Sequence, residues 1–315
     1  MTSPIKKVGF VGVGHMGTPM ASCLHRAGFE LWLMDANASA ASGLASSLGS
    51  PARAVANGTE LGQNCDLIIT MLPTSAIVRE VLLGSGGVLA AARAGTWFLD
   101  MTSGVPDQTQ EIAKFVSAAG CALLDAPVSG GVARARTGDL AIMVGGETDQ
   151  VEAVRPVLEA MGSHILRTGG TGSGHAMKAL NNLVSAGGFL ISVEAMMIGQ
   201  RFGLDPGVMV DVLNASSGSN NSTQKKCKQF VLSRGFDSGF GLDLMVKDLT
   251  IALGIANHEH TPAPFSSLCR ELWASTAAIL GPGQDHTAIS KLVETLTHTR
   301  LESACVPPKV QDRAP

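Results

Sequence analysis

The sequence predicts an α/β domain, built on a doubly wound and mainly parallel sheet, followed by an all-α domain. From the start to residue 168, short apolar runs alternate with helix-like segments, which is typical of successive βαβ units. Beyond the glycine-rich "RTGGTGSG" the segments become long and helix-like. We therefore expect a first domain at residues 1–169, a helical domain at 170–300 and a loose tail, mixing charge with proline, at 301–315.

Seven apolar runs are the expected strands of the sheet. In chain order they are "KVGFVG", "ELWLMD", "DLIITML", "GTWFLDM", "CALLDAPV", "LAIMVGG" and "SHILRTG". The helical domain should open with one helix over about residues 174–202, which at about 1.5 Å per residue spans about 40 Å. So long an apolar helix usually passes through a core or a subunit interface, and we expect a homodimer or homotetramer.

The composition favours a protein that works on small molecules. The 315 residues carry a net charge of -3, with 45% hydrophobic and 16% charged residues, and no long run of Lys or Arg. Neither a nucleic-acid stripe nor a polybasic membrane patch is expected. We see no signal-peptide h-region and no charge-free apolar segment of the about 20 residues that a membrane span needs. The six cysteines form no C-x-x-C pair, so we expect reduced thiols in a cytoplasmic protein without a metal site.

A glycine motif follows the first expected strand and opens the first helix. "VGFVGVGHMG" has G-x-G-x-x-G spacing, and the next strand ends in Asp35, 18 residues after the last glycine. Such glycines let the backbone approach a pyrophosphate at a helix N-terminus, where free N–H groups lie. The pattern predicts a Rossmann-type dinucleotide site, although a turn that needs glycine for steric reasons alone is the alternative. The loop comprises Gly12, Val13, Gly14, His15, Met16 and Gly17.

Asp35 and two later loops complete the predicted cofactor site. A carboxylate at Asp35 can accept from both ribose hydroxyls and repels a 2′-phosphate, and "ANASAAS" after it offers no arginine, so NAD is favoured over NADP. Ligands of doubly wound sheets bind beyond the carboxyl ends of the strands. Leu72, Pro73, Thr74 and Ser103 follow two such ends and are therefore candidates, with ordinary turn chemistry as the alternative.

Two further stretches carry groups suited to an acid substrate. "SGG", which is Ser129, Gly130 and Gly131, can present a hydroxyl and two backbone N–H groups to a carboxylate, although a flexible turn has the same composition. "GSGHAMKALNN" places Asn181 and Asn182 three and four residues after Lys178, on one helix face. A lysine extending from the helix start to solvent is the alternative there.

Four motifs together resemble the β-hydroxyacid dehydrogenases, the family that includes 3-hydroxyisobutyrate dehydrogenase. They are "GFVGVGHMGTPMASCL", "DAPVSGGVARARTGDLAIMVGG", "GSGHAMKALNN" and "KDLTIAL", in the family's order and spacing over roughly residues 5–298. The resemblance implies NAD(P)-dependent oxidation of a hydroxyl at the carbon β to a carboxylate. The chain departs from the family in having Thr102 and Ser103 where "ST" is common, in Arg134 and Arg136, and in lacking tyrosine.

By this resemblance, Lys178 matches the catalytic lysine and Asn182 the asparagine that orients lysine or substrate. Ser129, Gly130 and Gly131 match the carboxylate-binding loop. Asn181, three residues after Lys178, is a further substrate-binding candidate. Lys247, in "KDL", matches a lysine that closes over the nicotinamide end, although a Lys-Asp pair on an exposed helix face is equally common. Hydride transfer from an alcohol leaves a proton for a general base to take, and we expect Lys178 to be that base.

Two other functions remain open. An imine reductase would share the architecture but generally replaces the catalytic lysine, and a non-catalytic dinucleotide-binding interaction module would have lost it. The substrate side chain is also open between 3-hydroxyisobutyrate and a more polar hydroxy acid. The polar "NASSGSNNSTQKK" at residues 214–226 favours the polar acid if it approaches the substrate, but it equally suits a surface turn that caps the next helix.

Overall fold

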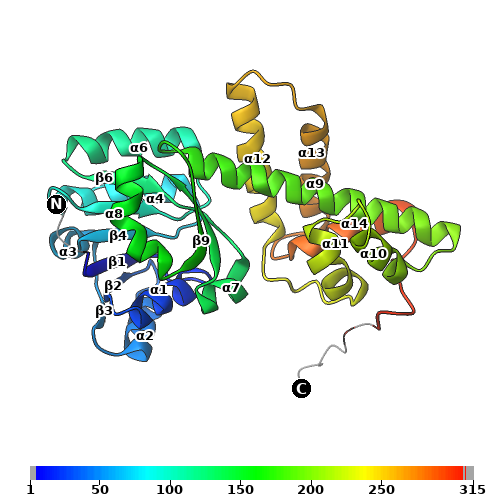
Figure 1. The fold of residues 1–315 in the computed structure, drawn as a ribbon, viewed down its shortest axis with the longest axis horizontal. Helices are drawn as coiled ribbons and strands as arrows, with labels where there is room; N and C mark the ends of the chain where they lie inside the picture. Colours follow the sequence, from blue (N-terminus) through cyan, green and yellow to red (C-terminus); the bar gives the residue numbers. More distant parts are fainter. Residues whose placement is uncertain (1–4, 308, 310–315) are drawn as a thin grey trace. The chain divides into compact units, whose positions relative to one another are not determined.

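The computed structural model describes residues 5–307 and 309. The chain forms two compact units, Met1–Lys178 and Ala179–Pro315. The division falls inside one long helix, and the expected domain boundary between residues 169 and 170 stays a prediction. The α/β architecture followed by an all-helical region is confirmed (Figure 1).

Unit 1 is built on a twisted, mostly parallel sheet. Its strands run in the order β3-β2-β1-β4-β5-β6-β8-β7, with β9 beside β8. The pairs from β3 to β6 are parallel, β8 is antiparallel to β6 and β7, and β9 is parallel to β8. The strand order reverses between β1 and β4, which is where ligands of such sheets bind. The strands are β1 (Lys7–Val11), β2 (Glu30–Met34), β3 (Ala52–Ala54), β4 (Leu67–Thr70), β5 (Trp97–Asp100), β6 (Ala122–Asp125), β7 (Val128–Ser129), β8 (Leu140–Gly145) and β9 (Gly162–Gly169).

Helices cover both faces of this sheet because its central strands are apolar on both sides. In β4, Leu67 and Ile69 join one core cluster with α1, α2 and α8, whereas Ile68 joins another with α3, α4 and α6, as the two-residue period of a strand requires. The helices are α1 (Gly17–Arg26), α2 (Ala38–Leu48), α3 (Gly58–Asn64), α4 (Ser75–Leu83), α5 (Val88–Ala91), α6 (Pro106–Ala118), α7 (Gly131–Thr137) and α8 (Thr148–Glu159).

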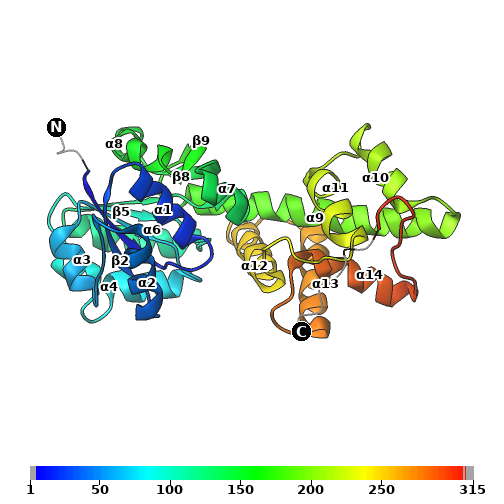
Figure 2. The ribbon, with the colours of Figure 1, turned by 90° about the horizontal axis from the view of Figure 1, so that it is seen from below.

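Unit 2 is helical and is organised around the long helix α9 (Ser173–Phe202), green in Figure 2. Its core contains Phe189 and Met196 of α9 together with Leu249 and Trp273 of the paired helices α12 and α13. The remaining elements are α10 (Pro206–Asn214), α11 (Asn221–Lys225), a π-helical turn (Cys227–Leu232), α12 (Leu242–His258), α13 (Pro264–Leu280), a 3₁₀ turn (His286–Ile289) and α14 (Ser290–Thr297).

α9 is also long and apolar enough, by length and composition, to cross a membrane. Its most apolar window has a mean hydropathy of 1.4, and 56% of that window is buried inside the protein. Phe189, Val193 and Met196 of this helix are fully buried in the unit 2 core. A core helix of a soluble protein passes the same test, so this finding is weak support for a membrane span.

The beginning of the C-terminal tail is anchored at Leu301 and Ser303, while most of residues 302–307 are exposed and lie outside helices and strands, so the expectation of a loose tail stays a prediction. Leu301 is fully buried, and its N–H donates to the Glu294 carboxylate at 2.8 Å. The Ser303 hydroxyl donates to the Asp205 carboxylate at 2.8 Å. An apolar leucine and two carboxylate acceptors thus hold a segment whose prolines and charges suggested disorder. Residues 308 and 310–315 of the expected tail lie outside the described residues.

Candidate functional site

The glycine loop joins β1 to α1 at the edge where the strand order reverses. Gly12 has φ +96, and a Cβ there would collide with the carbonyl oxygen of Met71, while a Cβ on Gly17 would collide with that of Gly12. These two glycines are required by the fold itself. A Cβ on Gly14 would meet nothing within 4 Å in the part of the chain that the structure describes. Packing gives no reason for Gly14, whereas the approach of a pyrophosphate does.

Asp35 lies at the end of β2 and contacts the glycine loop directly. The Val13 N–H donates to one carboxylate oxygen at 2.8 Å, and the Asn37 N–H donates to the other at 2.8 Å. The side chain that caps α2 is that of Asn37, which accepts the Ser39 N–H, so Asp35 does not serve as the helix cap. The carboxylate is therefore held at the mouth of the loop.

The loops after β4 and β5 are linked to each other by Thr102. This buried residue accepts the Leu72 N–H on its hydroxyl at 3.1 Å. The Leu72 side chain lies beside Gly12, within 3.1 Å of where a Cβ would stand. The Thr74 hydroxyl caps α4 by accepting from Ile77 N–H, which fits its alternative role in a turn. Thr102 is thus the hydroxyl that shapes this edge, whereas the neighbouring Ser103 is half-buried.

The predicted carboxylate loop joins β7 to α7. Ser129 ends β7, and Gly130 and Gly131 have φ +136 and +67, a conformation that favours glycine. Nothing described lies within 4 Å of a Cβ on Gly131. Arg134, an unexpected residue in this motif, lies on α7 and forms an ion pair with Asp139 at 2.9 Å, so its guanidinium is paired with a nearby carboxylate.

The predicted lysine and asparagines lie on α9, at the junction of the two units. Lys178 is half-buried and is the last residue of unit 1. Within unit 2, the Asn182 amide donates to the Asp248 carboxylate and accepts from Asn181 at 3.1 Å. Lys247 lies 3.4 Å from the other Asp248 oxygen. Asp248 is 1% exposed, so the interpretation of "KD" as an exposed pair is wrong for the aspartate.

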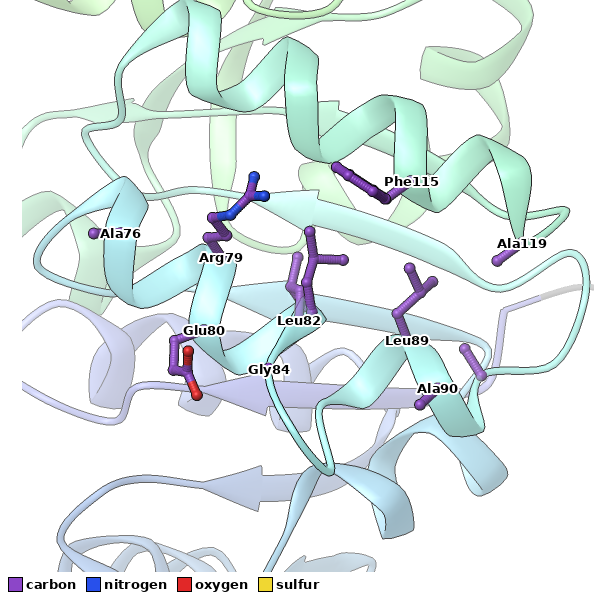
Figure 3. A pocket seen from close by; sticks show the side chains of 11 residues that line it. Ala76, Arg79, Glu80, Leu82, Gly84, Leu89, Ala90, Phe115 and Ala119 are labelled. Carbon is purple, nitrogen blue, oxygen red and sulfur yellow. The ribbon is translucent and has the colours of Figure 1, made fainter.

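Unit 1 has one open cavity that is lined by predicted site residues and another that is not. One, of about 710 Å³, lies between α4, α5 and α6 and is lined by Arg79, Leu89 and Phe115, but by none of the predicted site residues (Figure 3). Another, of about 450 Å³, is lined by Gly14 and His15 of the glycine loop and by residues of α1 and α7. The chemistry of the loops, rather than cavity size, therefore identifies the site.

Comparison with known families covers both units. Residues 7–170 match the family described as the NAD-binding domain of 6-phosphogluconate dehydrogenase. Residues 172–293 match the family described as NAD-binding of NADP-dependent 3-hydroxyisobutyrate dehydrogenase. The two matches meet just before α9 begins.

Individual proteins are similar over nearly the whole chain. It is 36% identical to 2-(hydroxymethyl)glutarate dehydrogenase of Eubacterium barkeri, covering 92% of this chain and 96% of that one. It is 35% identical to 3-sulfolactaldehyde reductase of Escherichia coli (strain K12), covering 91% and 95%. Mycobacterium tuberculosis 3-hydroxyisobutyrate dehydrogenase, solved with L-serine, superposes with a TM-score of 0.85 at 32% identity, covering 92% and 99%.

An imine reductase from Myxococcus stipitatus superposes with a TM-score of 0.62 at 15% identity, covering 92% of this chain and 100% of that one. That likeness shows the fold alone. The two family matches and the relatives above 30% identity go further. The chain belongs to the 3-hydroxyisobutyrate dehydrogenase-like family of β-hydroxyacid dehydrogenases and is an NAD(P)-dependent oxidoreductase that acts on CH–OH groups.

Proposed function

We propose that this chain interconverts a small β-hydroxy acid and its carbonyl form with NAD, and that Lys178 is the general acid and base. The observation that carries the proposal is the placement of Lys178 within two turns of the start of α9, in the same compact unit as the glycine loop and the Ser129–Gly131 loop. Bound NAD supplies the acceptor for the hydride. Lys178 takes the hydroxyl proton in oxidation and returns it in reduction.

The remaining groups bind and orient. The Ser129 hydroxyl and the backbone N–H groups of the following glycines anchor the substrate carboxylate, in a turn where both glycines have positive φ. Asn182, fixed by Asp248, orients the reacting groups from one helical turn after Lys178. Lys247 acts at the nicotinamide end, as the family resemblance implies.

The substrate class follows from the similar proteins. Their names specify 2-(hydroxymethyl)glutarate, 3-sulfolactaldehyde and 3-hydroxyisobutyrate, each of which combines a hydroxyl or aldehyde carbon with an acid group. The polar segment at 214–226 gives less support for a polar side chain than expected. Asn220 from that segment caps α11 through the Ser222 and Thr223 N–H groups, so part of its polarity serves local structure.

Asp35 supports NAD as the preferred cofactor. Its carboxylate is held at the end of β2 by two main-chain N–H groups, where it would repel a 2′-phosphate. We expect Asp35→Ser to raise KM for NAD and to lower the NAD to NADP ratio of kcat/KM, with kcat largely preserved because the residue is remote from the reacting carbon. An unchanged ratio would leave cofactor choice to other residues.

The central experiment measures NADH formation with a panel of 3-hydroxy acids for the wild type and Lys178→Ala. General acid-base groups contribute about 10²–10⁴-fold, so we expect kcat to fall by that factor while NAD binding, followed by fluorescence, is retained. Lys114→Ala, at an exposed lysine of α6, is the matched control. Full activity in Lys178→Ala, or no turnover of any 3-hydroxy acid by the wild type, would contradict the proposal.

We also propose that the chain assembles as a homodimer or homotetramer through α9. Val184, Ile191 and Ile198 are 77%, 54% and 71% exposed and recur every seven residues, so they form an apolar stripe along the helix. Light scattering after gel filtration tests this, with Ile198→Glu expected to shift the mass toward the monomer. A monomeric wild type would rule the assembly out.

A further inference from the structure

A buried polar cluster lies where α9 begins, entirely within unit 1. It consists of Asp100 at the end of β5, Asp125 at the end of β6, Thr109 on α6 and His175 on the first turn of α9. These residues are 2%, 0%, 1% and 1% exposed. Buried ionisable groups disfavour folding unless they are paired, so such a cluster needs a reason.

The Asp125 carboxylate holds the start of α9 by accepting hydrogen bonds from main-chain N–H groups there. Its two oxygens accept the Gly172 N–H at 2.6 Å and the His175 N–H at 2.8 Å. These are donors at a helix N-terminus, which have no partner within the helix. A Cβ on Gly174 would collide with the Met143 carbonyl oxygen, so the turn is pressed against the sheet. Burial raises the pKa of Asp125, while the neighbouring His175 and the two N–H groups oppose that shift.

The His175 side chain holds the same turn from another direction. Its Nδ1 lies 2.7 Å from the Thr109 hydroxyl on α6, and its Nε2 lies 3.9 Å from an Asp100 oxygen. The ring also rests against the loop after β5, because a Cβ on Gly104 would stand 2.7 Å from its Cε1. The other Asp100 oxygen accepts the Thr102 N–H at 3.1 Å, so the carboxylate fixes the loop that the imidazole touches.

The contacts connect two parts of the proposed site. The loop that contains Thr102 and Gly104 follows β5, where the cofactor is expected, and Lys178 comes three residues after His175 on one helix face. We propose that His175 is a positioning residue for Lys178. By fixing the first turn of α9 to the loop after β5, His175 sets the position of the Lys178 ammonium group. This inference rests on the proposed role of Lys178.

The imidazole is suited to this task because it makes contacts in two directions from one rigid ring. An apolar side chain of similar size would fill the space but would lose the hydrogen bond to Thr109. Asparagine can place a polar atom where Nδ1 lies, whereas leucine has the same branching and no polar atom. The pair His175→Asn and His175→Leu therefore separates the hydrogen bond from the volume.

The test compares these variants for kcat, for KM of NAD and of the best 3-hydroxy acid, and for thermal unfolding. A displacement of about 1 Å at a reacting group can cost about 10²-fold in rate, so we expect His175→Leu to lower kcat by about 10–100-fold, with KM for NAD within about twofold. His175→Asn should recover part of the loss. Thr109→Val, which removes only the hydroxyl partner, should lower kcat in the same direction and covers the case in which His175→Leu does not fold.

The decisive measurement repeats the His175 and Thr109 variants in a Lys178→Ala background. If His175 acts through Lys178, substituting His175 in the Lys178→Ala background should lower kcat by no more than about a further twofold. The reason is that the effects of groups that act as a unit do not add. A loss of the same factor in both backgrounds, or wild-type kcat in both His175→Leu and Thr109→Val, would overturn the positioning role. Full activity of Lys178→Ala alone would instead overturn the proposed function.

Discussion

Each compact unit buries one histidine almost completely, and both rings face a hydroxyl and a carboxylate. The His175 ring in unit 1 faces the Asp100 carboxylate and the Thr109 hydroxyl. The His286 ring in unit 2 faces Ser238 and Asp285, and it also lies among aromatic rings. Its centroid is 5.5 Å from Phe240, 5.9 Å from Phe189 and 6.4 Å from Trp273. The comparison shows that burial alone does not identify a functional histidine. What distinguishes His175 is Lys178, three residues later on the same face of α9.

The two regions also respond to acid in opposite senses. Burial raises the pKa of Asp125, so its contribution to stability is highest below its ordinary pKa of 3.8 and falls as pH rises through the raised value. Burial lowers the pKa of His286, although the hydrogen bond that its ring donates to the Asp285 carboxylate opposes that shift. Its contribution is therefore highest above the ordinary value of 6.5 and falls as pH drops through the lowered one. Acid therefore favours the folded state at Asp125 and disfavours it at His286.

The largest effect is expected from removing the carboxylate that holds α9. Asp125→Ala leaves the Gly172 and His175 N–H groups buried without their acceptor. Each such donor costs about 1–3 kcal/mol, so we expect the free energy of unfolding to fall by about 2–5 kcal/mol in urea denaturation. Asp125→Asn, which keeps one acceptor oxygen, should lose about half as much. Equal midpoints for Asp125→Ala and wild type would show that the contacts contribute nothing.

A medium effect is expected in the pH dependence of stability. From about pH 7 to about pH 5, across the ordinary titration range of histidine, the melting temperature of the wild type should fall, because unfolding lets the buried neutral His286 take up a proton. His286→Leu lacks this group, so its melting temperature should fall less. Asp125→Asn should gain stability relative to wild type as pH rises, since it lacks the buried charge. Parallel curves for all three proteins would remove the contrast between the two regions.

His286→Leu also serves as the matched buried-histidine control for kcat. None of its described side-chain neighbours is a proposed site residue; they are Ser238, Phe240, Asp285, Phe189 and Trp273. At the pH of maximal stability we therefore expect its kcat to stay within about threefold of wild type, whereas His175→Leu should lose about 10–100-fold. Equal losses in both variants would mean that any buried histidine affects the rate in the same way.

The smallest effect is expected in thiol labelling, which reports local opening in each unit. Cys305 is exposed and should react rapidly, whereas the other five thiols are buried, and burial raises the pKa of both Cys65 and Cys227 to about 12. In Asp125→Asn we expect slow additional labelling at Cys121, at the start of β6, and in His286→Leu at Cys227. Mass spectrometry of the labelled peptides distinguishes them, and labelling at the same cysteine in both variants would contradict separate opening.

The fold was predictable from sequence where the signal is local. Seven of the strands follow apolar runs and were expected, whereas β3 and β7 have only three and two residues and no such run. The helix start at Ser173 lies one residue before the expected position. The glycine loop and Asp35 were also expected, because their spacing alone brings them to one edge of a parallel sheet.

The buried polar groups were not predicted, because they come together from distant stretches. Asp100, Asp125 and His175 are 25 and 50 residues apart, and each looks ordinary where it stands. A usable signal was the aspartate that ends both "WFLD" and "ALLD", since parallel strands present their carboxyl ends at one edge. For Asp248, the signal was the apolar spacing of Met245, Leu249 and Ala252 on α12, which places it on the buried face.

The uninterrupted helix α9 has a consequence for making chimeras with related enzymes. Because the compact units divide between Lys178 and Ala179 inside this helix, there is no linker in which to join segments of different origin. Each residue of an α-helix turns the chain by about 100°, so a junction that gains or loses one residue there would rotate every later α9 side chain away from its counterpart. Exchange between relatives must therefore keep the helix in phase, and crossovers are better placed in the glycine-rich stretch that precedes Ser173.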